Sequence, residues 1–259
     1  MKISIIGNDA RYGYAARELK KHGFDVTTDA MKIADAVVIP INQSGATVVV
    51  KGKKLALADV VKANAGAAFF GGAALCGSLC DVFDGTRSYD ITKNEEFSAE
   101  NAHLTAEGAL GIIINKMPVA VRGARVAILG YGRVGRALVD VLVPLGALVT
   151  VFARSEAARA EAGKICAACD FSSFDGCFDA VVNTVPARVL TKKQKKRISL
   201  DALVIELASA PGGFCQSDIS HLGARYINAP GLPGKTAPAS AGKIMAKAIY
   251  DIIKGEYNK

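Results

Sequence analysis

Short apolar runs, each ended by glycine, proline or a polar turn, recur along the chain and predict buried strands. In the first part of the chain they occupy residues 2–7, 24–28 and 36–40, and a helical segment ending at Gly23 separates the first two. Strands that alternate with helices are typical of a parallel sheet covered by helices. We therefore predict a first α/β domain over residues 1–100.

The same alternation returns after residue 118 and predicts a second domain. Strands are expected at residues 125–129, 148–152, 180–183, 203–206 and 225–227, with a helix at residues 136–145. This spacing is that of a doubly wound parallel sheet with helices on both faces. The predicted fold is thus α/β with two α/β domains, the second of them, residues 119–236, of Rossmann type.

Two further helices are expected to join these domains. Residues 105–115 are rich in Ala, Gly and Ile, so residues 101–118 are predicted to form a connecting helix. After Pro238, apolar residues recur at helical spacing. We expect this last helix, within residues 237–259, to pack back onto the first domain.

The composition is that of a globular protein, with 51% hydrophobic and 22% charged residues. The N-terminal apolar stretch is too short for a signal peptide, and no apolar run reaches the roughly 20 residues of a membrane span. We therefore expect a soluble, cytoplasmic protein with no membrane contact. The formal charge of +8 is concentrated locally at residues 192–197, where no aromatic residues are interleaved. This run is interpreted as the solvated face of a short helix, and no nucleic-acid partner is predicted.

The six cysteines do not form a recognisable metal or redox motif. Cys166 and Cys169 have Cys-x-x-Cys spacing, but a second close pair is missing and the three histidines are scattered. We predict no metal site and expect reduced thiols that are buried or partly buried. The cysteines are Cys76, Cys80, Cys166, Cys169, Cys177 and Cys215, and the histidines are His22, His103 and His221.

A glycine-rich loop follows the strand predicted at residues 125–129 and opens the next helix. Glycine at the first position allows a sharp turn, glycine at the second lets the backbone approach a pyrophosphate, and glycine at the third lets helix and strand pack closely. The pyrophosphate then lies on the N–H groups of the helix N-terminus. The candidate cofactor-binding residues of this loop are Gly130, Tyr131, Gly132, Arg133, Val134 and Gly135.

The end of the following strand predicts which dinucleotide binds. Sites for NAD place Asp or Glu there, about 20 residues beyond the loop, to hold the ribose hydroxyls. This chain has Arg154 and Ser155 instead, a cation and a hydroxyl that suit a 2′-phosphate. The predicted cofactor is NADP, with Arg133 as a further contact, although Glu156 would reach the ribose if the turn lay differently.

Loops after the later strands line the nicotinamide side in such folds. The alternative is that the residues of these loops only form the turns and do not contact a cofactor. The candidate cofactor contacts in these loops are Thr184, Val185, Pro186 and Ala208.

A further set of motifs follows a fixed order along the chain. The first is Ile-Gly-Asn-Asp-Ala-Arg at residues 6–11, and Thr-Ala-Glu-Gly follows at 105–108. The others are Phe-Ala-Arg-Ser at 152–155, Asn-Thr-Val-Pro at 183–186, Glu-Leu-Ala-Ser-Ala-Pro-Gly-Gly at 206–213, Ala-Pro-Gly-Leu-Pro-Gly at 229–234 and Ala-Pro-Ala-Ser-Ala-Gly at 237–242. In this order they resemble the family formed by the A subunits of dipicolinate synthase, which has Gly in place of Asn8 and Asp in place of Glu206.

This resemblance implies an oxidoreductase that is one component of a multi-subunit enzyme of spore formation, in the mother-cell cytoplasm. It implies oxidation of a dihydro- or 4-hydroxy-tetrahydrodipicolinate intermediate of lysine biosynthesis to pyridine-2,6-dicarboxylate, with hydride transfer to NADP. A second, flavoprotein-like component, the B subunit of dipicolinate synthase, would work with it, and we expect a homo-oligomer. Two alternatives stay open: an NADP-dependent dehydrogenase of another small carboxylic acid, or a non-catalytic NADP(H)-binding regulatory protein.

A substrate with two carboxylates requires cations or backbone N–H groups. Arg11 and Lys235 are best placed, unless Arg11 pairs with Asp9 and Lys235 is solvated. The candidate substrate contacts, which we place mainly in the first domain, are Asp9, Arg11, Thr105, Lys235 and Ser240. Oxidation also releases a proton to a base or a water, and the candidate catalytic residues are His103, Glu107 and Lys235, with Asp9 as a further possible base.

Overall fold

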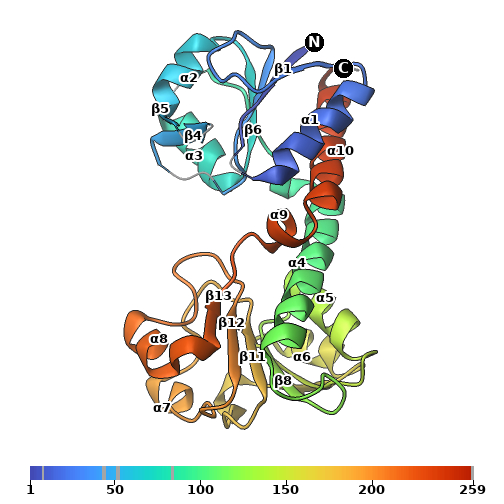
Figure 1. The fold of residues 1–259 in the computed structure, drawn as a ribbon, viewed down its shortest axis with the longest axis vertical. Helices are drawn as coiled ribbons and strands as arrows, with labels where there is room; N and C mark the ends of the chain where they lie inside the picture. Colours follow the sequence, from blue (N-terminus) through green and yellow to red (C-terminus); the bar gives the residue numbers. More distant parts are fainter. Residues whose placement is uncertain (8, 43–44, 51–52, 83–84, 258–259) are drawn as a thin grey trace. The chain divides into compact units, whose positions relative to one another are not determined.

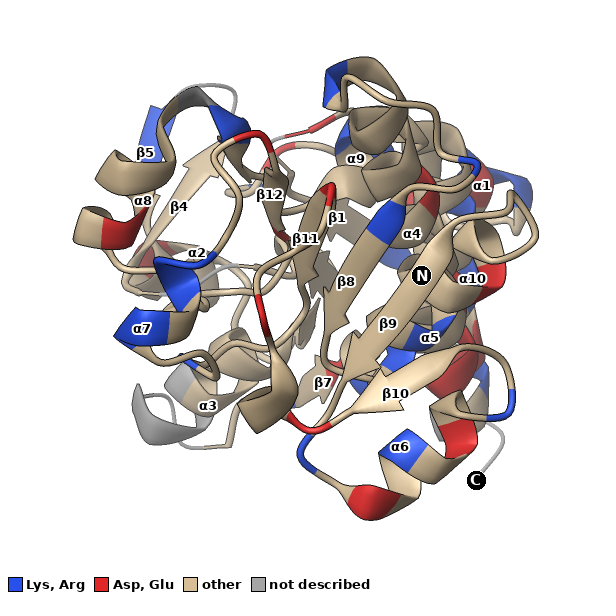
Figure 2. Ribbon diagram, turned by 90° about the horizontal axis from the view of Figure 1, so that it is seen from below, with Lys and Arg blue, Asp and Glu red and all other residues tan. Residues whose placement is uncertain are grey.

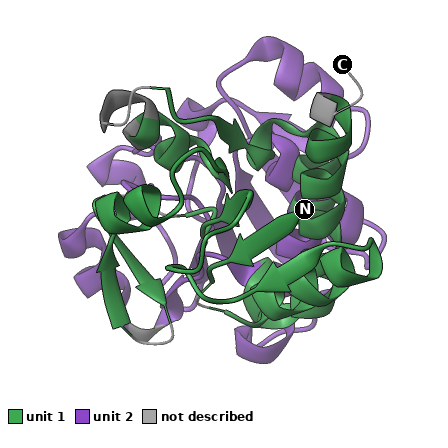
Figure 3. Cartoon of the chain, turned by 90° about the horizontal axis from the view of Figure 1, so that it is seen from above, with its two compact units in different colours: residues 1–101, 233–259 green, residues 102–232 purple. Residues whose placement is uncertain are grey.

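Two compact units make up the chain in the computed structural model, which describes residues 1–7, 9–42, 45–50, 53–82 and 85–257. One unit contains residues 1–101 and 233–259, and the other contains residues 102–232 (Figures 1 and 3). Asn8 lies outside the described residues. Each unit is built on a parallel sheet covered by helices.

The first unit has five parallel strands in the order β2-β1-β3-β6-β7, which is the order of flavodoxin-like sheets. These strands are β1 (Lys2–Ile5), β2 (Asp25–Thr27), β3 (Ala36–Val38), β6 (Ala68–Gly71) and β7 (Ser88–Asp90). Its helices are α1 (Ala10–Lys21), α2 (Leu57–Ala63), α3 (Ala73–Val82), η1 (Ile91–Lys93) and α10 (Pro238–Tyr257). β4 (Thr47–Val50) and β5 (Lys53–Ala56) form an antiparallel pair that the sequence pattern did not predict.

Neighbouring residues of the first sheet point into two different cores. Ile3 and Phe70 lie in a core with α1 and α10, whereas Val37 and Phe69 lie in a core with α2 and α3. This alternation follows from the two-residue period of a strand, so a sheet that is apolar on both faces is covered on both. The last helix, α10, packs along α1 (Figure 1), as predicted.

The second unit has six parallel strands in the order β10-β9-β8-β11-β12-β13. Counted from β8, this is the order 3-2-1-4-5-6 of a Rossmann sheet. The strands are β8 (Arg125–Leu129), β9 (Leu148–Phe152), β10 (Ala167–Cys169), β11 (Ala180–Asn183), β12 (Leu203–Glu206) and β13 (Tyr226–Asn228). The helices are α4 (Glu95–Lys116, shared with the first unit), α5 (Arg133–Leu142), α6 (Glu156–Ala162), η2 (Phe171–Ser173), α7 (Lys192–Lys195), α8 (Gln216–Leu222) and η3 (Gly223–Arg225). Helix α9 (Leu232–Thr236) begins at the last residue of this unit, lies otherwise in the first unit and leads into α10.

Helices cover both faces of the second sheet, as predicted. Val126 and Ile128 of β8 face a core shared with α4 and α5, and Ala127 and Leu129 face a core that includes Leu222 of α8. Within the described residues, no helix is long and apolar enough to cross a membrane.

Two helix starts differ from the sequence prediction. Helix α4 begins at Glu95 instead of residue 101, because the Asn94 side chain accepts a hydrogen bond from the Phe97 backbone N–H (2.9 Å) and caps the helix. Helix α5 begins at Arg133 instead of Arg136, because Gly132 is the extended residue that precedes it.

The thiols are more exposed than predicted at one position. Cys76, Cys166, Cys169 and Cys215 are half-buried, whereas Cys177 is exposed. The side chain of Cys80 lies outside the described part of the chain.

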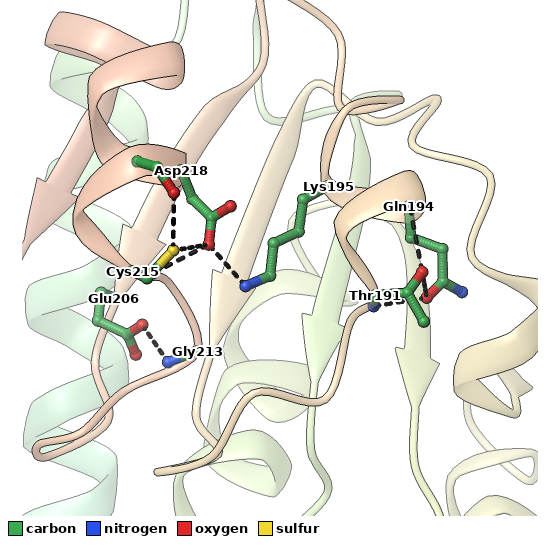
Figure 4. Close-up of polar contacts among 8 residues, drawn as sticks. Thr191, Gln194, Lys195, Glu206, Gly213, Cys215 and Asp218 are labelled. Carbon is green, nitrogen blue, oxygen red and sulfur yellow. Dashed lines mark hydrogen bonds and ion pairs between the residues drawn. The ribbon is translucent and has the colours of Figure 1, made fainter.

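The interpretation of residues 192–197 as a fully solvated helix face is wrong for Lys195. Its side chain is buried, and its ammonium lies 2.7 Å from the carboxylate of Asp218 on α8 (Figure 4). The remaining lysines of α7 are exposed. Figure 2 marks the Lys and Arg positions of this helix in blue. The partner of Lys195 lies 23 residues further along the chain, so a local charge pattern does not reveal it.

Candidate functional site

The glycine loop lies where the strand order of the second sheet reverses. It follows β8, and the loop after the neighbouring strand β11 lies directly against it. The Thr184 hydroxyl donates to the Leu129 carbonyl (2.8 Å), and the Thr184 backbone N–H donates to the same oxygen (2.9 Å). In open α/β sheets, ligands bind at this switch point, outside the carboxyl ends of the strands.

Each glycine of the loop meets a different surrounding. Gly130 has φ +101°, and a Cβ there would lie 2.6 Å from Thr184 Oγ1. A Cβ on Gly135 would lie 2.3 Å from the Gly130 carbonyl oxygen, so this glycine permits the close packing of α5 on the loop. A Cβ on Gly132 would meet no protein atom within 4 Å. The space beside Gly132 is therefore open at the N-terminus of α5, where dinucleotide-binding folds bind a pyrophosphate.

Substitution of the last two glycines is expected to separate cofactor binding from folding. Gly132→Ala should weaken dinucleotide binding at least about tenfold while leaving the melting temperature nearly unchanged, because the added methyl group enters the ligand's space alone. Gly135→Ala should lower the melting temperature as well, because it displaces the loop backbone. Fluorescence titration with NADPH and thermal unfolding of both variants measure this. Unchanged NADPH affinity in Gly132→Ala would exclude this loop as the pyrophosphate site.

Tyr131 contributes to the loop through its backbone and packs its side chain against α5. The residue is 8% exposed, and the guanidinium of Arg136 lies 4.7 Å from its ring centroid. Arg136 also pairs with Glu161 of α6. Arg133 is exposed and Val134 half-buried in the first turn of α5.

Arg154 and Ser155 are exposed in the turn between β9 and α6. Ser155 is the N-cap of α6, where its hydroxyl accepts from the Ala158 N–H (3.4 Å). The hydroxyl proton is still available to a phosphate, because capping uses only an oxygen lone pair. Glu156 is exposed in the first turn of the same helix.

Arg159 holds this turn, a role that the sequence pattern did not predict. Its Nη1 donates to the carbonyl oxygens of Ala153 (2.9 Å) and Arg154 (2.6 Å), and it lies 3.7 Å from a carboxylate oxygen of Asp170. These hydrogen bonds come from a residue of α6, and they fix the backbone from which the Arg154 side chain projects. The only sequence signal is a cation five residues after Arg154, which many helices contain.

A buried polar network connects the loops after β11 and β12. Glu206 accepts hydrogen bonds from the side-chain amide of Asn183 (2.7 Å) and the backbone N–H groups of Ala208 (3.2 Å) and Gly213 (2.8 Å, Figure 4). Asn183 in turn donates to the Val185 carbonyl (2.9 Å). Burial raises the pKa of Glu206, although these hydrogen bonds oppose the shift. The two motif residues, Asn183 and Glu206, are therefore structural, and they set the positions of Val185 and Ala208.

Exposure differs among the candidate residues of these two loops. Thr184, Val185 and Ala208 are half-buried, and Pro186 is exposed. Thr184 also faces Gly130, so the two loops form one surface at the carboxyl ends of β8 and β11.

In the first unit, Asp9 and Arg11 form a two-point ion pair at the start of α1. Arg11 Nε lies 3.0 Å from both carboxylate oxygens, and Nη2 lies 2.8 Å from Oδ2. From the sequence, Arg11 was expected either to contact the substrate or to pair with Asp9, and the structure shows the pair with Asp9. Burial would lower the pKa of Arg11, but the bonds to Asp9 raise it overall. Gly234 lies against the pair, since a Cβ there would be 2.8 Å from Arg11 Nε.

The remaining candidates are mostly accessible. Lys235 on α9 and Ser240 in the first turn of α10 are exposed in the first unit. In the second unit, His103 and Glu107 are exposed one turn apart on α4, and Thr105 is half-buried. Among the described residues, no three His, Cys, Asp or Glu side chains are grouped to hold a metal ion.

A sheet in this strand order, with a glycine turn at its switch point, is the arrangement of dinucleotide-binding domains. Residues 93–204 match the family model described as D-isomer specific 2-hydroxyacid dehydrogenase, NAD binding domain. This match supports a nicotinamide cofactor and an oxidoreductase role.

The resemblance inferred from the motifs is confirmed. The A subunit of dipicolinate synthase from Bacillus subtilis (strain 168) is 30% identical to this chain over 167 residues. The matched segment covers 63% of this chain and spans 56%, little more than half, of that relative.

Solved structures confirm the α/β prediction over nearly the whole chain. The A subunit of dipicolinate synthase from Bacillus halodurans matches with a TM-score of 0.86 at 24% identity, covering 97% of each chain. The A chain of dipicolinate synthase from Bacillus subtilis matches with a TM-score of 0.83 at 24% identity, covering all of this chain and 98% of that chain. At this identity the likeness shows the fold.

Proposed function

We propose that this chain is the NADP-dependent oxidoreductase component of an enzyme that forms pyridine-2,6-dicarboxylate from a dihydro- or 4-hydroxy-tetrahydrodipicolinate intermediate. The relatives, which are A subunits of dipicolinate synthase, support the product, and the dehydrogenase-type domain supports the redox class. Loss of water from the 4-hydroxy compound gives a dihydropyridine. This then loses one hydride to the nicotinamide and one proton to a base or water, and becomes aromatic.

The choice of NADP is carried by the turn after β9. A cation and a hydroxyl, Arg154 and Ser155, project where NAD sites present an acid. Arg159 fixes the backbone of this turn through two hydrogen bonds, so the Arg154 side chain starts from a fixed backbone. Glu156 opens α6, where a carboxylate is favoured by the helix dipole.

For the substrate, the surface around Asp9 and Arg11 is the strongest candidate in the first unit. Asp9 fixes the guanidinium of Arg11, and Lys235 on α9 and Ser240 on α10 are exposed. Lys235 would bind one carboxylate as a mobile cation. His103 and Glu107 are the candidates to take the proton. A second protein, flavoprotein-like by the resemblance, would complete the enzyme.

A coupled assay tests this function. Purified protein is mixed with NADP⁺ and enzymatically generated 4-hydroxy-tetrahydrodipicolinate, with and without a candidate B subunit. Pyridine-2,6-dicarboxylate and NADPH are followed together. We expect the two products in a 1:1 ratio, as the hydride balance demands.

One control variant and two contradicting outcomes make the assay decisive. In the Gly132→Ala variant the formation of both products should fall together, because the substitution weakens only the binding of the cofactor. Dipicolinate formed without NADPH would exclude hydride transfer to this cofactor. If NADPH binds but neither product forms under either condition, the dipicolinate assignment is wrong, and the regulatory alternative is favoured.

A further inference from the structure

A basic cavity lies between α7 and α8, apart from every residue assigned above to cofactor or substrate. Its volume is about 310 Å³, and its lining residues are Lys192, Lys195, Lys196, Ser217, Asp218, His221 and Leu222. This volume lies at the lower end of the range of small-molecule sites, about 300–1,000 Å³.

The charges of this cavity are unbalanced. The single carboxylate of the lining, Asp218, is neutralised by Lys195 at 2.7 Å, and both side chains are nearly buried (Figure 4). Lys195 also lies 5.2 Å from the Phe214 ring centroid, which fixes it further. Two lysines, Lys192 and Lys196, are therefore left with positive charge and no carboxylate in the lining.

These two lysines are arranged to act together. They lie one turn apart, and the Lys196 backbone N–H donates to the Lys192 carbonyl (3.2 Å), so both project from the same side of the segment. A capping box fixes the start of α7: the Gln194 N–H donates to the Thr191 hydroxyl (3.3 Å), and Gln194 Oε1 accepts from the Thr191 N–H (2.9 Å, Figure 4). The buried ion pair joins α7 to α8, so the two walls of the cavity are linked.

The wall formed by α8 adds polar donors and an apolar base. Ser217 carries a hydroxyl in the first turn, and His221 adds ring nitrogens one turn further on. Leu222 is 3% exposed and closes the cavity towards the core. Two cations, neutral donors and a small apolar surface together suit a compact anion that carries two or more charges.

We propose that this cavity is a binding site for a small di- or trianion, of the phosphate-ester or polycarboxylate class. The site is separate from the dinucleotide loop and does not depend on the proposed function. Lys192 and Lys196 bind the charged groups, Ser217 and His221 donate hydrogen bonds, and the Lys195–Asp218 pair holds the walls together.

The test uses pyrophosphate and citrate as probes, titrated calorimetrically into protein saturated with NADPH, so that the dinucleotide site is blocked. Lys192→Gln/Lys196→Gln removes both anion-binding charges. The matched control is Lys193→Gln/Arg197→Gln, which removes two charges with the same spacing from the same run but outside the cavity lining. We expect at least one probe to bind, at least tenfold weaker binding in the first variant, and wild-type binding in the control.

Other outcomes would overturn the site. Equal losses in both variants would show general attraction to a basic surface, and absence of binding by both probes would show that the cavity holds no such anion. Chemical shifts of the Ser217 and Leu222 amides locate the bound probe. NADPH affinity is measured separately in every variant, so a failure of the dinucleotide assignment is seen independently, and the titration is then repeated without NADPH.

Discussion

Replacing Arg154 with Asp is expected to raise the dissociation constant for NADPH by about 10- to 100-fold or more. One charge-assisted hydrogen bond is worth about 1.5–3 kcal/mol, and a carboxylate in its place also repels the 2′-phosphate. Binding of NADH should be unchanged or tighter, because an acid there holds the ribose hydroxyls. Fluorescence titrations with both nucleotides at constant ionic strength measure the ratio.

Arg197→Asp is the matched control for this prediction. It makes the same charge change at an exposed position outside the turn after β9, so it should leave the NADPH to NADH ratio at the wild-type value. Arg159→Gln should shift the ratio in the same direction as Arg154→Asp but less, because it only releases the turn. If Arg154→Asp changes the dissociation constants for NADPH and NADH by the same factor, the turn after β9 does not select NADP.

Asp218→Asn is expected to lower the free energy of unfolding by about 3 kcal/mol. Removing one member of a buried ion pair leaves the other charge uncompensated, at a cost of about 3–5 kcal/mol. Here Lys195 would lose its partner while its side chain stays 7% exposed. Urea unfolding measures the change.

Two variants show whether the effect belongs to this ion pair. Asp201→Asn should change stability by less than about 1 kcal/mol, because Asp201 is 98% exposed in its pair with Arg225. Lys195→Met/Asp218→Leu should recover most of the stability, because no buried charge remains. A loss in the double variant as large as in Asp218→Asn would mean that packing, and not the charge, is responsible.

The same carboxylate makes stability depend on pH. Burial opposes ionisation, but the bonds from Lys195 and from the backbone and thiol of Cys215 lower the pKa of Asp218 to about 2. Since the pKa is lower in the folded than in the unfolded state, this stabilisation is complete above about pH 4 and is lost as the pH falls towards 2. It amounts to about 2 kcal/mol. The unfolding free energy of Asp218→Asn should therefore fall less steeply over that interval than that of the wild type.

The Rossmann sheet was predictable because its signals are local. Strand β8 was expected at residues 125–129 and is found there, since five apolar-rich residues end at a glycine that the turn requires. The motif residues Asn183 and Glu206 were visible as well. Their contact with each other depends on two adjacent strands, so only the structure revealed that Glu206 holds the loops in place.

The missed features depend on partners far apart in the chain or on weak local signals. The burial of Lys195 requires Asp218, and the role of Arg159 requires two backbone carbonyls that have no sequence signature. The early start of α4 did have a local signal, Asn94 before two glutamates, which is typical of an N-cap with acidic residues in the first turn. The β4–β5 pair was missed because its strands are short and half-exposed.

The return of α10 to the first sheet has a consequence for synthesis of the chain. One face of that sheet is covered by α1 and by apolar residues of α10, including Met245, Ile249 and Ile253. The ribosome makes this helix after the entire second unit, residues 102–232. At about 5–20 residues per second, the growing chain carries a half-covered N-terminal sheet for many seconds while the second unit can already complete its own core. The N-terminal sheet is therefore translated first but can be completed only after α10, the last helix, has left the ribosome.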